Sequence, residues 1–225
     1  MVFHRALFSD HFCSFCISTI YLSASAVFLD SKIVSVIKDM MSSADLQPCI
    51  NAVTEWTKKW LVKLNSKKCV VMHLGNSNPR HKYTIEDCCD INSSRDTLKE
   101  SSFERDLGVH ISSDLKWKKH IDEIVSKANR VLGMLVKTFI CKDIDLWRNL
   151  YVSLVRPHLE YASVIWNPYY KGDINALEKV QRRASKIPLD MRHKPYEERL
   201  KIWNLTSLEE RRTRGDRYLS KFGLF

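Results

Sequence analysis

Clustered basic residues in the C-terminal half are the side chains best suited to contact a ligand. They recur at helical spacing, which keeps several of them on adjacent turns. The members of this first cluster are Lys179, Arg182, Arg183 and Lys186. Such side chains hold the phosphates of a nucleic acid and position it without reading its sequence. A solvated helix face has the same pattern, and the sequence gives the two interpretations equal weight.

A second basic cluster follows in the last predicted helix. Its members are Arg211, Arg212, Arg214 and Arg217. Acidic neighbours at 209, 210 and 216 neutralise part of its charge. We therefore take Arg211 and Arg212 as further candidate contacts to nucleic acid, from a cluster with a smaller local charge excess.

Metal chemistry has one candidate residue, Asp30. The stretch 28–36 is predicted to form strand, turn and strand, with Asp30 and Ser31 at the tip. A carboxylate there faces solvent or a metal, and alone it is usually a turn residue. His11-x-Cys13-x-x-Cys16 is half of a zinc pattern without its second pair, so no metal site is predicted. No nucleophile elbow or glycine-rich phosphate loop occurs.

The charge of the chain is unevenly distributed. Of a net +10 over 225 residues, residues 1–115 contribute nothing, with 13 Lys/Arg and 13 Asp/Glu, whereas residues 116–225 hold 23 against 13. A one-sided basic half favours a polyanionic partner, nucleic acid first and acidic lipid second. Seven cysteines without a framework spacing predict reduced thiols and hence an intracellular protein. The uncharged stretch 12–29 resembles a secretory signal, but a buried strand over 21–29 is preferred.

The N-terminal half has the order of an α+β fold. A helix is predicted over 45–63, and its apolar face is expected to include Leu46, Cys49, Ile50, Val53, Trp56, Trp60 and Leu61. Strands are predicted at 69–74 and at 103–111, where Gly108 marks a bulge or a close approach of the backbone. The stretch 76–102 between them is polar and contains no long element apart from 83–85.

Everything after residue 116 is predicted to be helical, as an all-α bundle. The expected helices cover 119–140, 143–155, 174–186, 196–203 and 207–220. The apolar stretch 150–168 is the expected centre of the bundle, with a break or kink at Arg156 because Pro157 follows. Asp173 is the expected N-cap of the helix that carries the first basic cluster.

Several strings, taken together and in order, resemble the C-terminal part of jockey-type non-LTR retrotransposon reverse transcriptases. In the first half these are Glu55-Trp-Thr-Lys-Lys-Trp60, Leu64-Asn-Ser-Lys-Lys-Cys-Val-Val-Met-His-Leu-Gly75 and Arg105-Asp-Leu-Gly-Val-His-Ile-Ser-Ser-Asp-Leu-Lys-Trp117. In the second half they are Lys127-Ala-Asn-Arg-Val-Leu-Gly133, Ser153-Leu-Val-Arg-Pro-His-Leu-Glu-Tyr-Ala162, Leu177-Glu-Lys-Val-Gln-Arg-Arg-Ala184 and Tyr196-Glu-Glu-Arg-Leu200.

The resemblance implies a truncated palm-like region, a small sheet with a helix, at 1–115 and a thumb-like helical bundle at 116–225. It also implies that Asp30 is vestigial. The family carries an aromatic-Ala-Asp-Asp box there, and its carboxylates hold two Mg²⁺ ions for nucleotidyl transfer. This chain reads Phe28-Leu29-Asp30-Ser31 and keeps one carboxylate. No metal or other cofactor is therefore expected for this chain, although the intact family uses magnesium.

These observations predict a remnant of an RNA-directed DNA polymerase, inactive alone, whose basic helices bind RNA or an RNA–DNA duplex in the nucleus or cytoplasm. A membrane partner is not expected, and the sequence does not fix the oligomeric state. One alternative is a helical protein-interaction module with Trp147, Trp203 and Tyr218 as anchors, although packing of these rings in the core is the preferred expectation. Another is an unselected product whose strands at 69–74 and 109–111 lack sheet partners.

Overall fold

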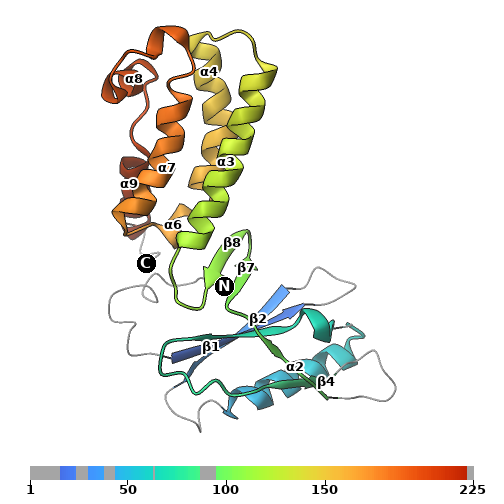
Figure 1. Cartoon of the computed structure of the whole chain (residues 1–225). Helices are drawn as coiled ribbons and strands as arrows, with labels where there is room; N and C mark the ends of the chain where they lie inside the picture. Colours follow the sequence, from blue (N-terminus) through green and yellow to red (C-terminus); the bar gives the residue numbers. More distant parts are fainter. Residues whose placement is uncertain (1–15, 24–29, 38–43, 63, 87–94, 222–225) are drawn as a thin grey trace. The chain divides into compact units, whose positions relative to one another are not determined.

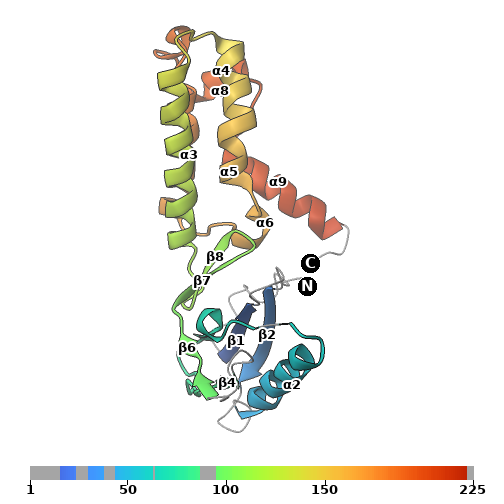
Figure 2. The same ribbon diagram turned by 90° about the vertical axis from the view of Figure 1, so that its right-hand side faces the viewer.

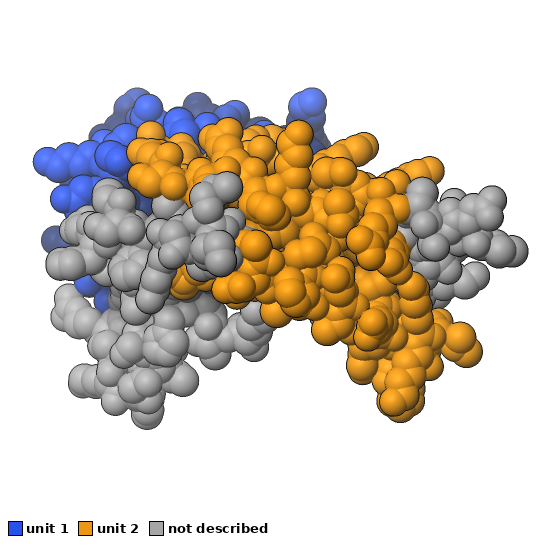
Figure 3. Space-filling model, turned by 90° about the horizontal axis from the view of Figure 1, so that it is seen from below, with its two compact units in different colours: residues 1–7, 107–109, 117–225 blue, residues 8–106, 110–116 orange. Residues whose placement is uncertain are grey.

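The computed structural model describes residues 16–23, 30–37, 44–62, 64–86 and 95–221, and the statements below concern these residues. They form a mixed α+β fold, as predicted, with the strands before residue 113 and mainly helices after it. Within the described ranges the chain divides into two compact units, one of residues 107–109 and 117 onward and one of residues up to 106 together with 110–116. In Figure 3 the sheet-containing unit, which comes first in the chain and is called the first unit below, is orange (unit 2 of the key), and the helical unit, called the second unit below, is blue (unit 1 of the key). Division into domains at residue 115 stays a prediction, because compact units need not fold independently.

The first unit in chain order is built on a four-stranded sheet with the order β2-β1-β3-β6. Its elements are β1 (Cys16–Ser23), β2 (Asp30–Ile37), α2 (Leu46–Lys59), η3 (Ser66–Lys68), β3 (Val70–Leu74), β4 (Thr84–Glu86), β5 (Arg95–Thr97), β6 (Lys99–Glu100) and β7 (Phe103–Asp106). Strand β1 is antiparallel to both β2 and β3, while β3 and β6 are parallel. Strand β3 is thus paired on both sides, which corrects the expectation that it lacks partners.

Helix α2 packs on one face of this sheet (Figure 1), with Leu46 and Ile50 buried as predicted but with two threonines in place of the tryptophans. Its buried side consists of Leu46, Ile50, Thr54 and Thr57. The two threonine hydroxyls donate to helix carbonyls one turn back, which satisfies them inside the core. The sheet-facing side is therefore rotated by about a quarter of a turn from the tryptophan side. Consequently the predicted inward residues Cys49, Trp56, Trp60 and Leu61 are exposed.

Two turns differ from the sequence-based prediction. Asp30 and Ser31 do not form the tip of their hairpin, because they lie inside β2 and pair with Ser23 and Leu22 of β1. The stretch 103–111 is not one strand but a hairpin of β7 and β8 (Val109–Ser112). Its turn residues Leu107 and Gly108 both have positive φ, 45° and 88°, as in the tight turns that match the twist of paired strands.

The second unit is a helical bundle around three fully buried tryptophans, Trp147, Trp166 and Trp203. Its helices are α3 (Lys118–Thr138), α4 (Ile144–Leu150), η4 (Tyr151–Val155), α5 (Arg156–Glu160), α6 (Ser163–Trp166), α7 (Lys171–Ala184), η5 (Leu189–Met191), α8 (Tyr196–Ile202) and α9 (Leu208–Lys221). Packing of Trp147 and Trp203 in the core is confirmed, which removes them as surface anchors. Tyr218 lies where only the backbone is described.

Of the break or kink predicted at Arg156, the break is wrong, although the helix is irregular there. Helix α4 continues through the π-helical turn η4 into α5, so that α4 and α5 lie in one column (Figure 2). The Arg156 N–H donates to the Tyr151 carbonyl five residues back, and this wider turn accommodates Pro157 without ending the helix. The chain breaks instead after Glu160, where Ala162 adopts a left-handed conformation with φ of 52°.

A buried hydrogen-bond network joins α7 to the start of α9. Glu178, only 6% exposed, accepts hydrogen bonds from the Tyr196 hydroxyl and from the Leu208 backbone N–H, the latter at 3.1 Å. Gln181 accepts from the Tyr151 hydroxyl at 2.6 Å and donates to Tyr196 Oη at 2.9 Å. Burial and the hydrogen bond to Glu178 raise the pKa of Tyr196, which keeps its hydroxyl a donor. The network fixes the relative placement of α7, α8 and α9.

Candidate nucleic-acid interface

The first basic cluster lies on the exposed face of α7 and its C-terminal turn. On the opposite face of the helix, Leu177, Val180 and Ala184 are buried in the core. Because the apolar positions are spaced at helical periodicity, the cations between them must point outward. Lys179, Arg182, Arg183 and Lys186 are all exposed. The predicted N-cap, however, is wrong: Tyr170 precedes the helix, and Asp173 is buried in its first turn.

Helix α3 packs beside α7 and adds two cations to this surface. Arg183 Nη1 donates to Asn129 Oδ1 of α3 at 3.4 Å. The next residue, Arg130, and Lys137 two turns later are also exposed. Between residues 124 and 142 the sequence contains four Lys or Arg and no Asp or Glu. We call six of the exposed cations on α3, on α7 and in the turn after α7 the α3/α7 basic face, namely Arg130, Lys137, Lys179, Arg182, Arg183 and Lys186.

Helix α8 holds one member of the α3/α7 basic face in place. The Arg182 guanidinium lies 5.0 Å from the centroid of the Tyr196 ring, and that of Arg199 lies 5.5 Å from it. Arg199 Nη1 also donates to the Arg182 carbonyl at 3.1 Å. Burial lowers the pKa of Arg199, although an arginine this far above neutrality keeps its charge. Tyr196 thus orients Arg182 at the surface while its hydroxyl is fixed in the buried network.

The second basic cluster is used inside the fold. Arg211 makes a two-pronged ion pair with Glu160, with Nε–Oε1 at 2.6 Å and Nη2–Oε2 at 3.2 Å. Arg212 is 3% exposed, so its guanidinium does not face solvent. Arg214 pairs with Glu210 at 3.2 Å, and Arg217 lies where only the backbone is described. Of the predicted contacts, only the four on α7 form a common surface.

Asp30 is placed as the first residue of β2, and its side chain lies outside the described part of the structure. Among the described residues, no group of three or more His, Cys, Asp or Glu side chains could hold a metal ion. The magnesium pair of the family resemblance therefore finds no matching donor set in this part of the chain. We derive no catalytic step from it.

Sequence reasoning missed Asn129, Arg130 and Lys137 of α3 as parts of the site. The long acid-free run at 124–142 was a usable signal for the two cations. Nothing in the sequence indicated that α3 would pack beside α7, because that neighbourhood depends on how the bundle closes. The role of Tyr196 likewise depends on a contact between separate helices.

No helix within the described ranges is long and apolar enough to cross a membrane. No family model matches the chain, and no solved structure matches it.

Curated relatives do match the chain at low identity. It is 26% identical to the RNA-directed DNA polymerase from mobile element jockey of Drosophila funebris over 168 residues. These aligned residues cover 70% of this chain and 17% of that protein. The Drosophila melanogaster polymerase of the same description is 23% identical over 194 residues, covering 81% of this chain and 19% of that protein. An uncharacterized protein of Caenorhabditis elegans is 27% identical over 110 residues, covering 48% of this chain and 56% of that protein. This chain thus spans less than a fifth of the polymerases, and the similarity supports an origin related to the reverse transcriptases of mobile elements.

Proposed function

We propose that this chain corresponds to a C-terminal part of a non-LTR retrotransposon reverse transcriptase and binds RNA or an RNA–DNA duplex through the α3/α7 basic face. The observation that carries the proposal is the gathering of six exposed cations on two adjacent helices. The family resemblance and the similarity to the jockey polymerases supply the class of partner.

The α3/α7 basic face suits a phosphate backbone better than a small anion. Its cations are distributed along two helices, so they match a repeating line of charges rather than one point. Lys179 and Arg183 are four residues apart and therefore about 6 Å apart along the helix axis. The planar guanidinium of Arg183 can still donate to phosphate through the nitrogens that do not contact Asn129. Contacts of this kind are independent of base sequence.

The proposal assigns this chain binding rather than nucleotidyl transfer, in the nucleus or cytoplasm. Two metal ions in the family's mechanism require several hard oxygen ligands, and Phe28-Leu29-Asp30-Ser31 supplies one carboxylate. Primer extension by the purified chain with magnesium tests this part directly. We expect no extended product, whereas extension that disappears in Asp30→Ala would contradict it.

Fluorescence anisotropy with a labelled RNA–DNA duplex tests the binding. The expected affinity falls steeply as salt rises from about 50 to 200 mM, because phosphate contacts release counterions. Replacing Lys179 and Arg183 together by alanine should lower the slope of log affinity against log salt by roughly 1.8, at about 0.9 per contact. Lys201→Ala is the matched control, since Lys201 is an exposed lysine of α8 outside the α3/α7 basic face. An equal slope for all three proteins, or no salt-dependent binding, would show that the α7 cations form only a solvated face.

A further inference from the structure

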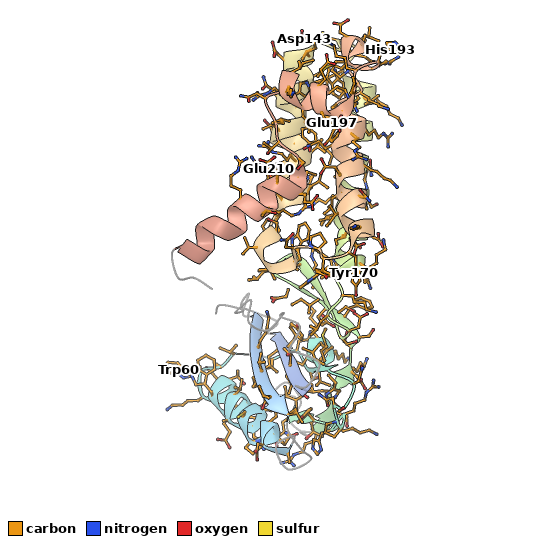
Figure 4. All side chains as sticks on the ribbon, turned by 90° about the vertical axis from the view of Figure 1, so that its left-hand side faces the viewer. Trp60, Asp143, Tyr170, His193, Glu197 and Glu210 are labelled. Carbon is orange, nitrogen blue, oxygen red and sulfur yellow. The ribbon has the colours of Figure 1, made fainter. Side chains whose placement is uncertain are left out.

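Two tryptophans at the C-terminal end of α2 lie on the surface of the first unit. Trp56 is 48% exposed and Trp60 is 62% exposed. Their ring centroids are 6.4 Å apart and the ring planes are inclined by 44°. Figure 4 shows Trp60 at the end of α2, on the outside of the unit. Each indole can therefore present aromatic surface to a ligand.

These indoles do not build the core on which α2 rests. The buried side of the helix is filled by Ile50, Thr54 and Thr57 instead. Leu61 directly follows Trp60 and is 89% exposed, so three large apolar side chains gather at one helix end. Single exposed apolar residues are ordinary on protein surfaces, whereas a contiguous group marks an interaction site.

The chain around the tryptophans is the most basic part of an otherwise neutral half. Residues 56–68 contain five lysines and no Asp or Glu, while the rest of residues 1–115 holds 8 Lys/Arg against 13 Asp/Glu. Lys59 is exposed and lies three residues from Trp56, which makes the two neighbours on the helix surface. Lys58 and Arg95 share the single carboxylate of Glu86, at 2.6 and 3.3 Å, so a positive charge remains there too.

We propose that Trp56, Trp60 and Lys59 form a stacking site for the unpaired bases of a single-stranded nucleic acid. A base of any identity stacks on an exposed indole, and a neighbouring lysine attracts the phosphates. Lipid is the other surface that favours tryptophan beside lysine, but an interfacial helix needs a continuous apolar face. In α2 the apolar residues Leu46 and Ile50 are buried against its own sheet, and Asn51, Glu55 and Lys58 occupy the other exposed side, so the apolar strip left for a lipid surface is narrow. This site is independent of the α3/α7 basic face, because it uses other residues and an unpaired strand.

The test compares two labelled single strands on the full chain by fluorescence anisotropy. One is an oligothymidylate of about 15 nucleotides, within the length that a single-strand site covers, and the other is an abasic strand of equal length and charge. We expect the wild-type chain to prefer the strand with bases. Trp60→Ala or Trp56→Ala should weaken oligothymidylate binding about 5- to 150-fold, the equivalent of ~1–3 kcal/mol per stacked base, and leave abasic binding unchanged. Trp60→Phe should restore most of the affinity.

Phe103→Ala is the matched control, because Phe103 is an exposed aromatic residue of the same unit outside the basic segment. It should bind within about twofold of the wild type, since it removes no stacking partner. Trp60→Leu keeps apolar bulk without a stacking ring, so it should weaken oligothymidylate binding as the alanine variants do. It replaces an alanine variant that fails to fold. Equal wild-type affinity for the two strands, or unchanged binding by the tryptophan variants, overturns the proposal. Loss of cosedimentation with phosphatidylserine vesicles in Trp60→Ala, with oligothymidylate binding intact, would assign the site to lipid instead.

Discussion

Replacing Glu178 by alanine should strongly lower the free energy of unfolding of the helical unit, although Glu178 lies in a helix whose exposed face is basic. Glu178 is a buried carboxylate that accepts from the Tyr196 hydroxyl, the Leu208 N–H and, at 3.4 Å, Gln181 Nε2. Alanine removes the acceptor and leaves these donors in place. The Leu208 N–H is the most costly of them, because it is buried at the first residue of α9, where no helix carbonyl can accept it.

The magnitude follows from the number and burial of these donors. A hydrogen bond to a charged group contributes roughly 1.5–3 kcal/mol, and a buried donor left without an acceptor loses about 1–3 kcal/mol. Two strong contacts and one long one therefore give about 3–5 kcal/mol, within the range for breaking one partner of a buried charged network. Glu178→Gln keeps the shape and one acceptor oxygen, so we expect about half that loss.

Urea unfolding of the full chain, followed by tryptophan fluorescence, measures the effect. Three of the six tryptophans are fully buried in the helical unit, so the signal reports its opening. Glu197→Ala is the matched control, because Glu197 is an exposed carboxylate of α8 (Figure 4). It should change the free energy of unfolding by less than about 0.5 kcal/mol. Equal midpoints for Glu178→Ala and Glu197→Ala would refute the reasoning, because the buried network would then carry no net stability.

Three further predictions concern other contacts. Arg211→Ala should lower the unfolding free energy by about 1–2 kcal/mol through loss of its half-buried pair with Glu160, while duplex affinity by anisotropy stays unchanged. Gly108→Ala should lower the stability measured by thermal melts by about 1–3 kcal/mol, because φ is +88° and the new Cβ would lie 3.3 Å from Tyr161. Its control is Gly133→Ala in α3, where a Cβ meets open space, and this variant should be neutral or slightly stabilising. Burial holds the pKa of His73 below its ordinary 6.5, so the unfolded chain binds the proton more readily than the folded chain. The free energy of unfolding should therefore fall as the pH drops below about 6.5. His73→Gln should reduce this fall, as measured by urea midpoints between neutral and acidic pH.

Local signals predicted most elements of the helical half correctly. The helices expected at 119–140, 196–203 and 207–220 are all present as α3, α8 and α9, and Ser207 Oγ accepts from the Glu210 N–H at 3.1 Å at the start of α9. Each depends on residues within a turn or two of one another, so the sequence contains the whole cause. The same holds for the outward direction of Lys179 and Arg183, which follows from the apolar positions between them.

Predictions failed where a residue had more than one local solution. The apolar spacing of α2 predicts Trp56 and Trp60 close to its buried face, but Thr54 and Thr57 are buried instead, because the helix backbone satisfies their hydroxyls. Pro157 predicts a break or a kink, and the helix does not break, because a single π-helical turn relieves the same clash. Competition between such solutions is decided by the surface against which the helix packs.

The sequence by itself determined the α+β order, the all-helical second half, the position of its positive charge and the resemblance to a retrotransposon polymerase. Only the tertiary structure decided which cations remain available to a ligand. Arg183 and Arg211 are alike in sequence context, yet one lies exposed beside Asn129 of α3 and the other is paired with Glu160 of α5. The physical reason is that an arginine at a helix surface takes its role from the neighbouring helix, and packing between helices distant in sequence is not encoded in any local pattern.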